Sequence, residues 1–415
     1  MSTVEEQEFK NKTVFFAPIW TDNYKNFVSV IGKDARYIKL PKDEAPQYML
    51  PYISGIYSNE ALYTEFGLLP EFFPTLSLLQ AENAAEKRAS LEEIRLSCFS
   101  TGCVFAELHI VYEGLSLDEI ADFSFRFKNA KHADREHKDG LTLLAALEGL
   151  IPKQAGASIF FAASDFKFEC KMFHQICTKE ALAAEELQRH LIHLRRGYHK
   201  DFPMPSFVGE YDMIFEPYPY DHWAGSQEGL VNIFHYTGNQ STDNFLKKYK
   251  PTHLSRNYRF MYLVLLNQRF GAICFLEKTS MAHKYTRREK EKLNLKTSYL
   301  KTSFSFSVVS DDQLYQTIYS HMYAILGIDR LLVDIHDNEE QIELLQNHEI
   351  LENEKMTSRF LFAISTLSLF SVLVDAAGYF DRFALLQSIS TALSAGCLMA
   401  ILLFYFGWWL NYRRK

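Results

Sequence analysis

The sequence lacks the short motifs by which many nucleotide-dependent and hydrolytic enzymes are recognised. A Walker loop, a GxGxxG fingerprint, an HExxH zinc motif and a GxSxG nucleophile elbow are all absent from its 415 residues. Such motifs place a phosphate, a metal or a nucleophile, so their absence removes the usual starting points for a catalytic site. We therefore expect a sensor or scaffold, and no enzyme.

A secretory leader and the paired cysteines of a zinc site are also missing. Acids stand where a signal peptide has basic residues in the N-terminal segment MSTVEEQEFKNKTVFFAPIW. Cys98 and Cys103 are separated by four residues, and no second pair follows at a matching distance. The other cysteines are Cys170, Cys177, Cys274 and Cys397. We expect a cytoplasmic body that keeps its thiols reduced.

An excess of positive charge is absent as well, since the formal net charge is −7. This balance argues against a nucleic-acid polymer as the main partner. The charges are nevertheless segregated along the chain. Residues 246–301 are mainly basic, whereas residues 311–354 are acidic and contain Arg330 as their only Lys or Arg.

The basic segment supports two interpretations. Its densest part, TRREKEKLNLK, suits a small anionic ligand such as a nucleotide, which Lys284, Arg287 and Arg288 would bind. The other interpretation is a surface helix that pairs with the acidic segment, within the chain or between subunits. We favour the second interpretation and keep the first open.

Two long apolar runs lie near the C-terminus, at residues 360–380 and 383–410. Each exceeds the roughly 20 mostly apolar residues that a helix needs to cross a bilayer. Only the polar pair 381–382 separates them. The pattern predicts a hairpin of two transmembrane helices.

The charged flanks of this hairpin predict its orientation. Lys355 and Arg359 precede the first run, and residues 413–415 after the second run are Arg, Arg and Lys. Basic flanks remain in the cytoplasm by the positive-inside rule. We expect a multi-pass protein of the inner (cytoplasmic) membrane with both termini cytoplasmic.

The acidic segment predicts a long helix. It has no proline and one glycine, Gly327, and its apolar residues recur at helical spacing. We expect one helix over residues 311–380, bent if anywhere at Gly327, and about 100 Å long. Its acids could hold a divalent cation such as Mg²⁺, with Asp334 and Asp337 as the nearest approach to a cluster; the alternative is a solvated acidic face.

The rest of the chain predicts a mixed α and β body. β-branched and aromatic runs predict strands over residues 13–20, 27–32, 103–112, 158–164, 230–236, 259–266 and 269–280. Asn267 and Gln268 would join the last two strands as a hairpin. Amphipathic spacing predicts helices over residues 77–96 and 179–194. Ser116 and Glu119 have the spacing of a capping box at the start of another helix.

This arrangement resembles the CorA-like divalent cation channels: an α/β body, an acidic stalk helix, a C-terminal membrane hairpin and a short basic tail. The family's Gly-Met-Asn motif does not stand at the outer end of the first apolar run, which reads Asp375-Ala-Ala-Gly-Tyr-Phe. The resemblance implies a homo-oligomer, usually a pentamer, whose first span lines the pore. Some divergent members are nucleotide-sensing effectors in type III CRISPR antiviral defence.

One face of the first apolar run is polar. Ser358, Ser365, Ser368, Ser371 and Asp375 fall within about 140° on a helical wheel, although Thr366 does not. In an oligomer these residues would line a pore, and Asp375 would form an acidic ring that attracts cations. The alternatives are small residues for close helix packing and an aspartate that marks the membrane interface.

The predicted fold is an α+β cytoplasmic domain with a long stalk helix and a C-terminal two-helix transmembrane hairpin. The predicted segments are a sensor domain at 1–309, a stalk at 310–358, spans at 359–380 and 384–410 around a turn at 381–383, and a tail at 411–415. We expect an oligomeric cation channel gated through its stalk. The alternatives are a nucleotide-gated defence effector and a membrane-tethered interaction protein.

Overall fold

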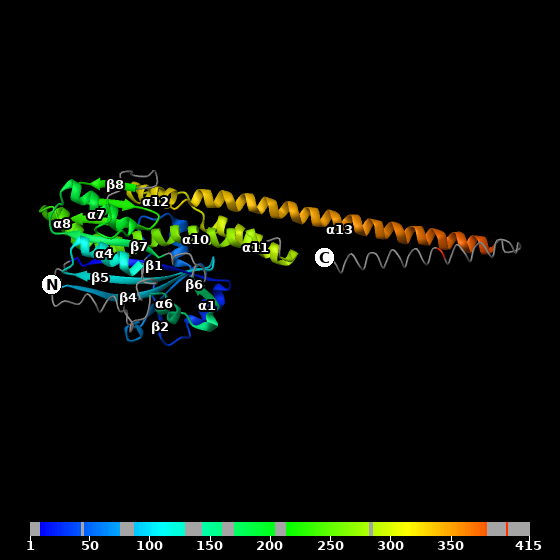
Figure 1. Ribbon diagram of the computed structural model, residues 1–415, viewed down its shortest axis with the longest axis horizontal. Helices are drawn as coiled ribbons and strands as arrows, with labels where there is room; N and C mark the ends of the chain where they lie inside the picture. The colour runs from blue at the N-terminus through cyan, green and yellow to red at the C-terminus, as the bar shows by residue number, and fades with distance from the viewer. Residues whose placement is uncertain are drawn as a thin grey trace. The chain divides into compact units, whose positions relative to one another are not determined.

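The computed structural model describes residues 9–42, 45–74, 87–128, 143–159, 170–203, 213–281, 285–379 and 396. The chain forms two compact units, Met1–Glu339 and Glu340–Lys415. The first unit, called the body here, combines helices and strands, as the sequence predicts (Figure 1). The second unit is described up to residue 379 as helix, with residue 396 also helical.

In the described part of the chain, ten strands form one sheet. Their order is β2-β3-β4-β5-β1-β7-β10-β9-β8, with β6 also paired to β1. The strands are β1 (Asn11–Thr21), β2 (Tyr37–Lys39), β3 (Tyr63–Leu68), β4 (Arg88–Phe99), β5 (Cys103–Glu113), β6 (Ala157–Ile159), β7 (Lys171–Thr178), β8 (Met213–Tyr218), β9 (Asp221–Gly225) and β10 (Gly229–His235). Only the pair β7–β10 is parallel; the other pairs are antiparallel.

Helices occupy the chain between and after these strands. They are α1 (Tyr24–Ile31), α2 (Pro51–Ser58), α4 (Leu117–Lys128), α6 (Leu143–Leu150), α7 (Ala184–Arg196), α8 (Gln240–Lys248), α9 (Lys250–Thr252), α10 (Arg259–Ser280), α11 (Arg287–Phe304), α12 (Gln313–Ile325) and α13 (Ile328–Tyr379). Two 3₁₀ turns, η1 (Pro70–Phe72) and η2 (Lys153–Ala155), and a π-helical turn, η3 (His253–Tyr258), complete the described elements.

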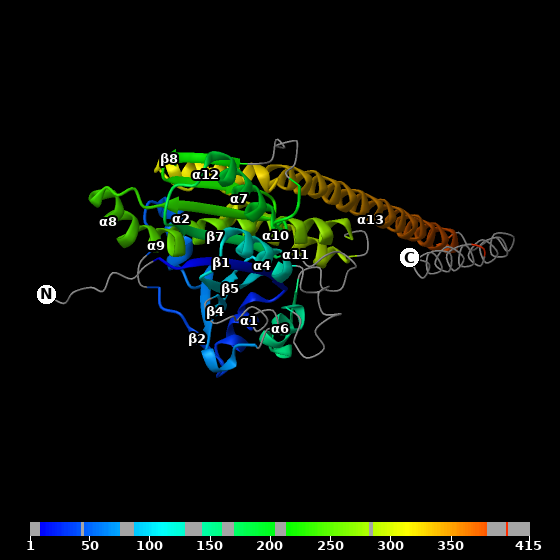
Figure 2. The ribbon, with the colours of Figure 1, turned by 60° about the vertical axis from the view of Figure 1, so that its left-hand side comes forward.

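Helices cover both faces of the sheet, because successive strand residues point to opposite sides (Figures 1 and 2). On one face, Phe15 of β1 joins a core with Phe27 of α1, Phe123 of α4 and Leu191 of α7. On the other face, the neighbouring Phe16 meets Tyr262 of α10, with ring centroids 5.5 Å apart. The result is a three-layer body with the sheet in the middle.

Several predictions for the body are confirmed. Strands cover residues 13–20, 103–112 and most of 230–236. The amide of Ser116 donates to Glu119 (2.8 Å) and the amide of Glu119 donates to the Ser116 hydroxyl (3.3 Å), which closes the capping box before α4. The helix predicted over 179–194 begins later, as α7, and ends at Gly197 in the left-handed conformation. The strand predicted at 158–164 lies mostly outside the described residues.

The strands predicted over 259–266 and 269–280 are wrong, because these residues form the single helix α10. Asn267 and Gln268, expected in a turn, are buried inside it. The amide oxygen of Asn267 accepts from Thr101 (2.6 Å), and the Gln268 amide donates to Tyr319 (3.0 Å). A helix packed on nearly every side has no polar face, so its sequence loses the 3.6-residue period. The strand expected at 27–32 is likewise helix, in α1.

The helix predicted over 77–96 is also wrong where the structure describes it, since β4 begins at Arg88. Its Leu, Glu and Arg residues have high helix propensity, but pairing with β3 and β5 on either side overrides that weak preference. In the strand, Ile94 and Leu96 join one core, while Glu93, Arg95 and Ser97 point to the other face.

The continuous helix predicted over residues 311–380 is interrupted. Gly327 adopts a left-handed φ of 64° and separates α12 from α13. Helix α12 packs on β8, β9 and α10 through buried Tyr315, Ile318 and Tyr319. Helix α13 then continues without a break to Tyr379, and the boundary between the two units falls inside it.

Among the residues that the structure describes, one helical run, Gln240–Ser280, is long and apolar enough to cross a membrane. Of its most apolar window, 78% is buried inside the body, which favours a core helix. Of the two apolar runs predicted as spans, residues 360–379 are described as helix. The second run lies outside the described residues, apart from Gly396.

Candidate functional site

The residues predicted to line a pore all belong to α13. Ser358, Ser365, Ser368 and Ser371 are exposed, and the side chain of Asp375 lies outside the described residues. In the same unit, Leu344 is 68% exposed and Leu351 is 54% exposed. Residues 344, 351, 358 and 365 are each seven apart, so this exposed stripe continues from the acidic part of the helix into its apolar part.

The residues predicted to bind a nucleotide are not gathered into a site by the described residues. Lys284 and the side chain of Arg287 lie outside them, and Arg288 is exposed at the start of α11. Instead, the amine of Lys301 on α11 forms an ion pair with Glu339 on α13. This contact agrees with the alternative that the basic segment pairs with the acidic one.

The predicted metal residues, Asp334 and Asp337, are exposed on α13. Their neighbour Asn338 donates from its amide to the Thr279 hydroxyl of α10 (3.2 Å). Within the described residues, no group of three or more His, Cys, Asp or Glu side chains is placed to hold a metal ion.

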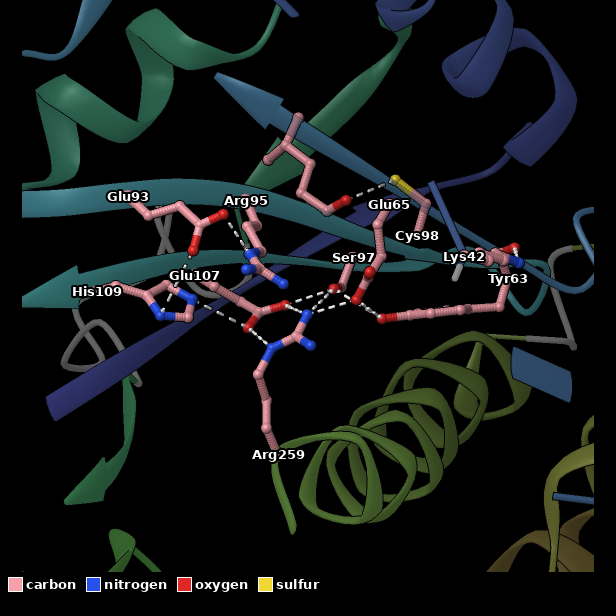
Figure 3. A network of polar contacts seen from close by, with 11 residues as sticks. Lys42, Tyr63, Glu65, Glu93, Arg95, Ser97, Cys98, Glu107, His109 and Arg259 are labelled. Carbon is pink, nitrogen blue, oxygen red and sulfur yellow. Dashed lines mark hydrogen bonds and ion pairs between the residues drawn. The ribbon is translucent and has the colours of Figure 1, made fainter. Parts of the chain in front are cut away.

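A buried ionic cluster, which sequence reasoning missed, lies between the sheet and α10 (Figure 3). Arg259 opens α10, and its Nε donates to Oε2 of Glu107 (2.6 Å) while Nη2 donates to Oε1 (3.1 Å). Nη2 also pairs with Glu65. Arg259, Glu65 and Glu107 are 2%, 3% and 0% exposed, so all three charges are removed from water.

The strand register explains why these groups meet. Glu65 of β3 stands opposite Ser97 of β4, and Arg95 of β4 stands opposite Glu107 of β5. Ser97 donates its hydroxyl to Glu107 and lies 3.0 Å from the Tyr63 hydroxyl, which itself donates to Glu65. Cross-strand pairing therefore collects the polar side chains of three adjacent strands on the face that α10 covers (Figure 3).

Glu107 and Arg259 offset each other's burial, which favours the ionised form of both. Burial alone would raise the pKa of Glu107, but the charge of Arg259, the nearby His109 ring and the hydrogen bonds from Arg259 hold this pKa well below its usual range. Burial would lower the pKa of Arg259, yet Glu107 and Glu65 raise it well above its ordinary value. Burial lowers the pKa of His109, although the neighbouring Glu107 opposes this shift. The lowered pKa favours the neutral imidazole ring.

Lys42 lies at the edge of the cluster. Its amine donates to the Tyr63 carbonyl (2.5 Å) and lies 5.3 Å from the centre of the Tyr63 ring. Partial burial lowers the pKa of this amine to about 8, despite the opposing charges of Glu65 and Glu60. Lys42 therefore adds a partly desolvated cation above the tyrosine that hydrogen-bonds Glu65.

A second buried ion pair lies on the other side of η3. The amine of Lys250 is 2.6 Å from Asp221 of β9, and the Asn232 amide of β10 donates to the other oxygen of Asp221 (2.6 Å). The π-helical turn is thus held between Lys250 and Arg259, which are bound to strands at different places in the sheet. Both ion pairs fix the long helical run to the sheet and give it one register.

The contacts of this cluster suit a structural role, in which the ion pairs position α10 on the sheet. The carboxylates of Glu65 and Glu107 are engaged by the guanidinium, the serine and the tyrosine around them. The signal that could have revealed the cluster was a carboxylate inside the otherwise apolar strand CVFAELHIVY, where Glu107 needs a buried cation. Comparison of the chain with protein-family models, curated proteins and solved structures finds no match.

Proposed function

We propose that this chain is the subunit of an oligomeric membrane cation channel of CorA-like build, gated through α13 by the body. The observation that carries the proposal is the exposure of large apolar side chains between residues 360 and 372 of α13. Exposed there are Phe360, Leu361, Phe362, Ile364, Leu369 and Val372, with Phe362 at 75%. Soluble monomers rarely leave so much apolar surface in water, so a bilayer or other copies of the helix would cover it.

The exposed stripe of residues 344, 351, 358 and 365 supports association of α13 with copies of itself. Leu344 and Leu351 are exposed in the acidic part of the helix, and Ser358 and Ser365 continue the spacing. A strict seven-residue repeat keeps one seam facing a partner helix along a left-handed supercoil. The same seam would therefore bring the serines of several copies together in the apolar part.

The chemistry of that seam suits cations. Serine hydroxyls offer oxygen ligands, and an acidic residue within a span is costly unless it faces water or protein. A ring of Asp375 side chains at the end of the helix would attract cations and repel anions. Ion flow along such a path needs no catalytic residue.

Contacts between the body and the first part of α13 support the proposal that the body gates the channel. Up to Glu339 the helix is tied to the body by the Asn338–Thr279 hydrogen bond and by the Lys301–Glu339 ion pair. Arg269 of α10 donates to the carbonyl of Leu326, at the end of α12. A rearrangement of α10 or α11 would therefore move the start of α13.

Replacing both exposed leucines of the seam by serine should weaken self-association. Burial of one leucine contributes roughly 1.5–3 kcal/mol, so Leu344→Ser with Leu351→Ser should lower the association constant by at least about tenfold. Mass photometry of the full chain in detergent measures this. Met356→Ser, on another face of α13, is the control and should leave the oligomer intact. An oligomer that survives the double substitution would show that the seam does not hold it together.

A further inference from the structure

Residues 47–52, called the strap here, cross the connector between α11 and α12. The connector comprises residues 305–312 and contains no helix or strand. Three hydrogen bonds join the two segments, each accepted by a backbone carbonyl: from the Leu50 amide to Val309 (2.9 Å), from the Tyr52 hydroxyl to Val308 and from the Ser310 hydroxyl to Tyr48. The Tyr52 ring also packs on Phe306, with ring centroids 5.0 Å apart. The strap therefore holds in place a segment that no helix or sheet stabilises.

The strap also contacts the first turns of α12. The Tyr48 ring stacks on Tyr315 of α12, with ring centroids 5.8 Å apart and planes 18° apart. The Tyr315 hydroxyl accepts from the side-chain amide of Asn257 in η3 (3.1 Å), and the Asn257 oxygen accepts from the backbone amide of Gln47 (3.2 Å). Asn257 and Tyr315 are 2% and 3% exposed, so both side chains are shielded from water. The strap, η3 and α12 are thus each bound to the other two.

The backbone of Tyr48 is strained. Its φ of 63° lies in the left-handed region, and no other non-glycine residue of the described ranges has a positive φ. A bulky residue keeps this conformation only while surrounding contacts hold it, and such residues gather at switch segments. Tyr48 and Tyr52 are 54% and 45% exposed, so the strap lies at the surface. A strained surface segment of this kind opens locally while the cores beneath it stay closed.

We propose that the strap is a releasable clasp, whose detachment frees the connector and α12 and so shifts the start of α13. The proposal rests on the gating given under the proposed function and names the element of the body that controls it. Only Leu326 and Gly327 separate α12 from α13. A displacement of α12 is therefore passed directly to the first turn of α13.

A permanent structural contact is the competing interpretation of the strap. The anchor of α10 is built differently, because its charged partners Arg259 and Glu107 are 2% and 0% exposed. The strap instead depends on neutral hydrogen bonds and on the rings of two exposed tyrosines. Neutral contacts at the surface cost less to break than a buried ion pair, which favours a segment that detaches.

Hydrogen exchange of the full chain in detergent, followed by mass spectrometry, tests the proposal. Leu50→Pro removes one amide donor without a backbone change, because Leu50 already has the φ of −60° that proline requires. Tyr52→Phe removes a second donor and keeps the ring beside Phe306. With both substitutions, peptides from the connector and the first turns of α12 should exchange about tenfold faster or more, whereas those of α10 should be unchanged.

The matched control is Leu50→Ala with Tyr24→Phe. It keeps the amide of residue 50 and removes another bond from a tyrosine hydroxyl to a backbone carbonyl, that of Tyr24 to Glu60 (3.2 Å) on a different part of the body. Exchange of α12 should stay within about twofold of wild type in this control. Equal exchange of α12 in the strap variant and the control overturns the proposal.

A comparison of two substitutions at Tyr48 tests the role of its backbone. Tyr48→Ala and Tyr48→Gly both remove the ring, but only glycine adopts the left-handed φ freely. Exchange of the connector should therefore be faster in Tyr48→Ala than in Tyr48→Gly. Equal exchange in the two variants would show that the strained backbone does not contribute to release.

Cation flux into liposomes, measured on the same variants, separates the strap from the channel. Release of the strap should change the rate of flux by about fivefold or more, as expected of a coupled site. A strap variant with faster exchange of α12 and wild-type flux overturns the role of the strap in gating. A wild-type chain that passes no cations, while its strap variant still shows the exchange response, overturns the proposed channel and leaves the clasp in place.

Discussion

Replacement of Arg259 by methionine is expected to lower the free energy of unfolding of the body by about 3–5 kcal/mol. The substitution leaves Glu65 and Glu107 buried, only 3% and 0% exposed, without the guanidinium that both of them contact. One or both carboxylates must then take up a proton or draw in water. Denaturant unfolding followed by tryptophan fluorescence measures the loss. Arg288→Met, at an exposed site of α11, is the control and should change stability by less than about 0.5 kcal/mol.

A compensated variant separates lost charge pairing from lost packing. Arg259→Met combined with Glu65→Gln and Glu107→Gln removes all three charges together. Replacing a buried ion cluster as a unit is often close to neutral, so this variant should regain much of the stability that the single substitution loses. If Arg259→Met unfolds at the same denaturant concentration as the wild-type chain, the cluster does not hold α10 on the sheet.

Replacement of Ser365 by phenylalanine is expected to reduce cation flux by about tenfold or more, because a hydrophobic constriction in a pore excludes water and ions. Ser365 belongs to the predicted polar face, and seven-residue spacing continues from it through Ser358 toward Leu351. In an oligomer each subunit would add one aromatic ring to the same level of the pore. Flux into liposomes, normalised to the amount of inserted protein, measures the change.

The matched control for this substitution is Ala363→Phe. Residue 363 lies two positions away on α13 and points about 160° from Ser365 on a helical wheel. A phenylalanine there should face lipid or the second span and leave flux within about twofold of wild type. Equal effects of the two substitutions would show that Ser365 does not line the ion path, whatever the oligomeric state.

Local signals in the sequence predicted part of the fold. The capping box of Ser116 and Glu119 and the terminal glycine of α7 depend on neighbouring residues alone, and both are present. Strands with buried β-branched residues, such as β1 and β5, were also predicted. Helix α10 and strand β4 were not, because their conformation is decided by what packs around them. A helix covered on nearly all sides and a strand rich in helix-forming residues mislead any local pattern.

The candidate site was less predictable than the fold. Glu65, Glu107 and Arg259 are far apart in the sequence, and only the strand register and the course of α10 bring them together. A carboxylate within an apolar strand signals that a buried partner must exist, but it does not say which cation supplies it. The serine stripe of α13 was readable because helical spacing alone defines it. The role of these serines depends on how copies of the chain assemble, and the sequence alone does not specify that assembly.

Cation flux through liposomes that contain the purified chain, compared with the Asp375→Ala variant, tests the central claim most directly. We expect the wild-type protein to pass cations in preference to anions. The variant should lose this preference and pass cations at least about tenfold more slowly, because the acidic ring at the end of the path is gone. A purified chain that is monomeric in the bilayer and passes no ions would contradict the account, and so would a wild-type flux that Asp375→Ala leaves unchanged in rate and selectivity.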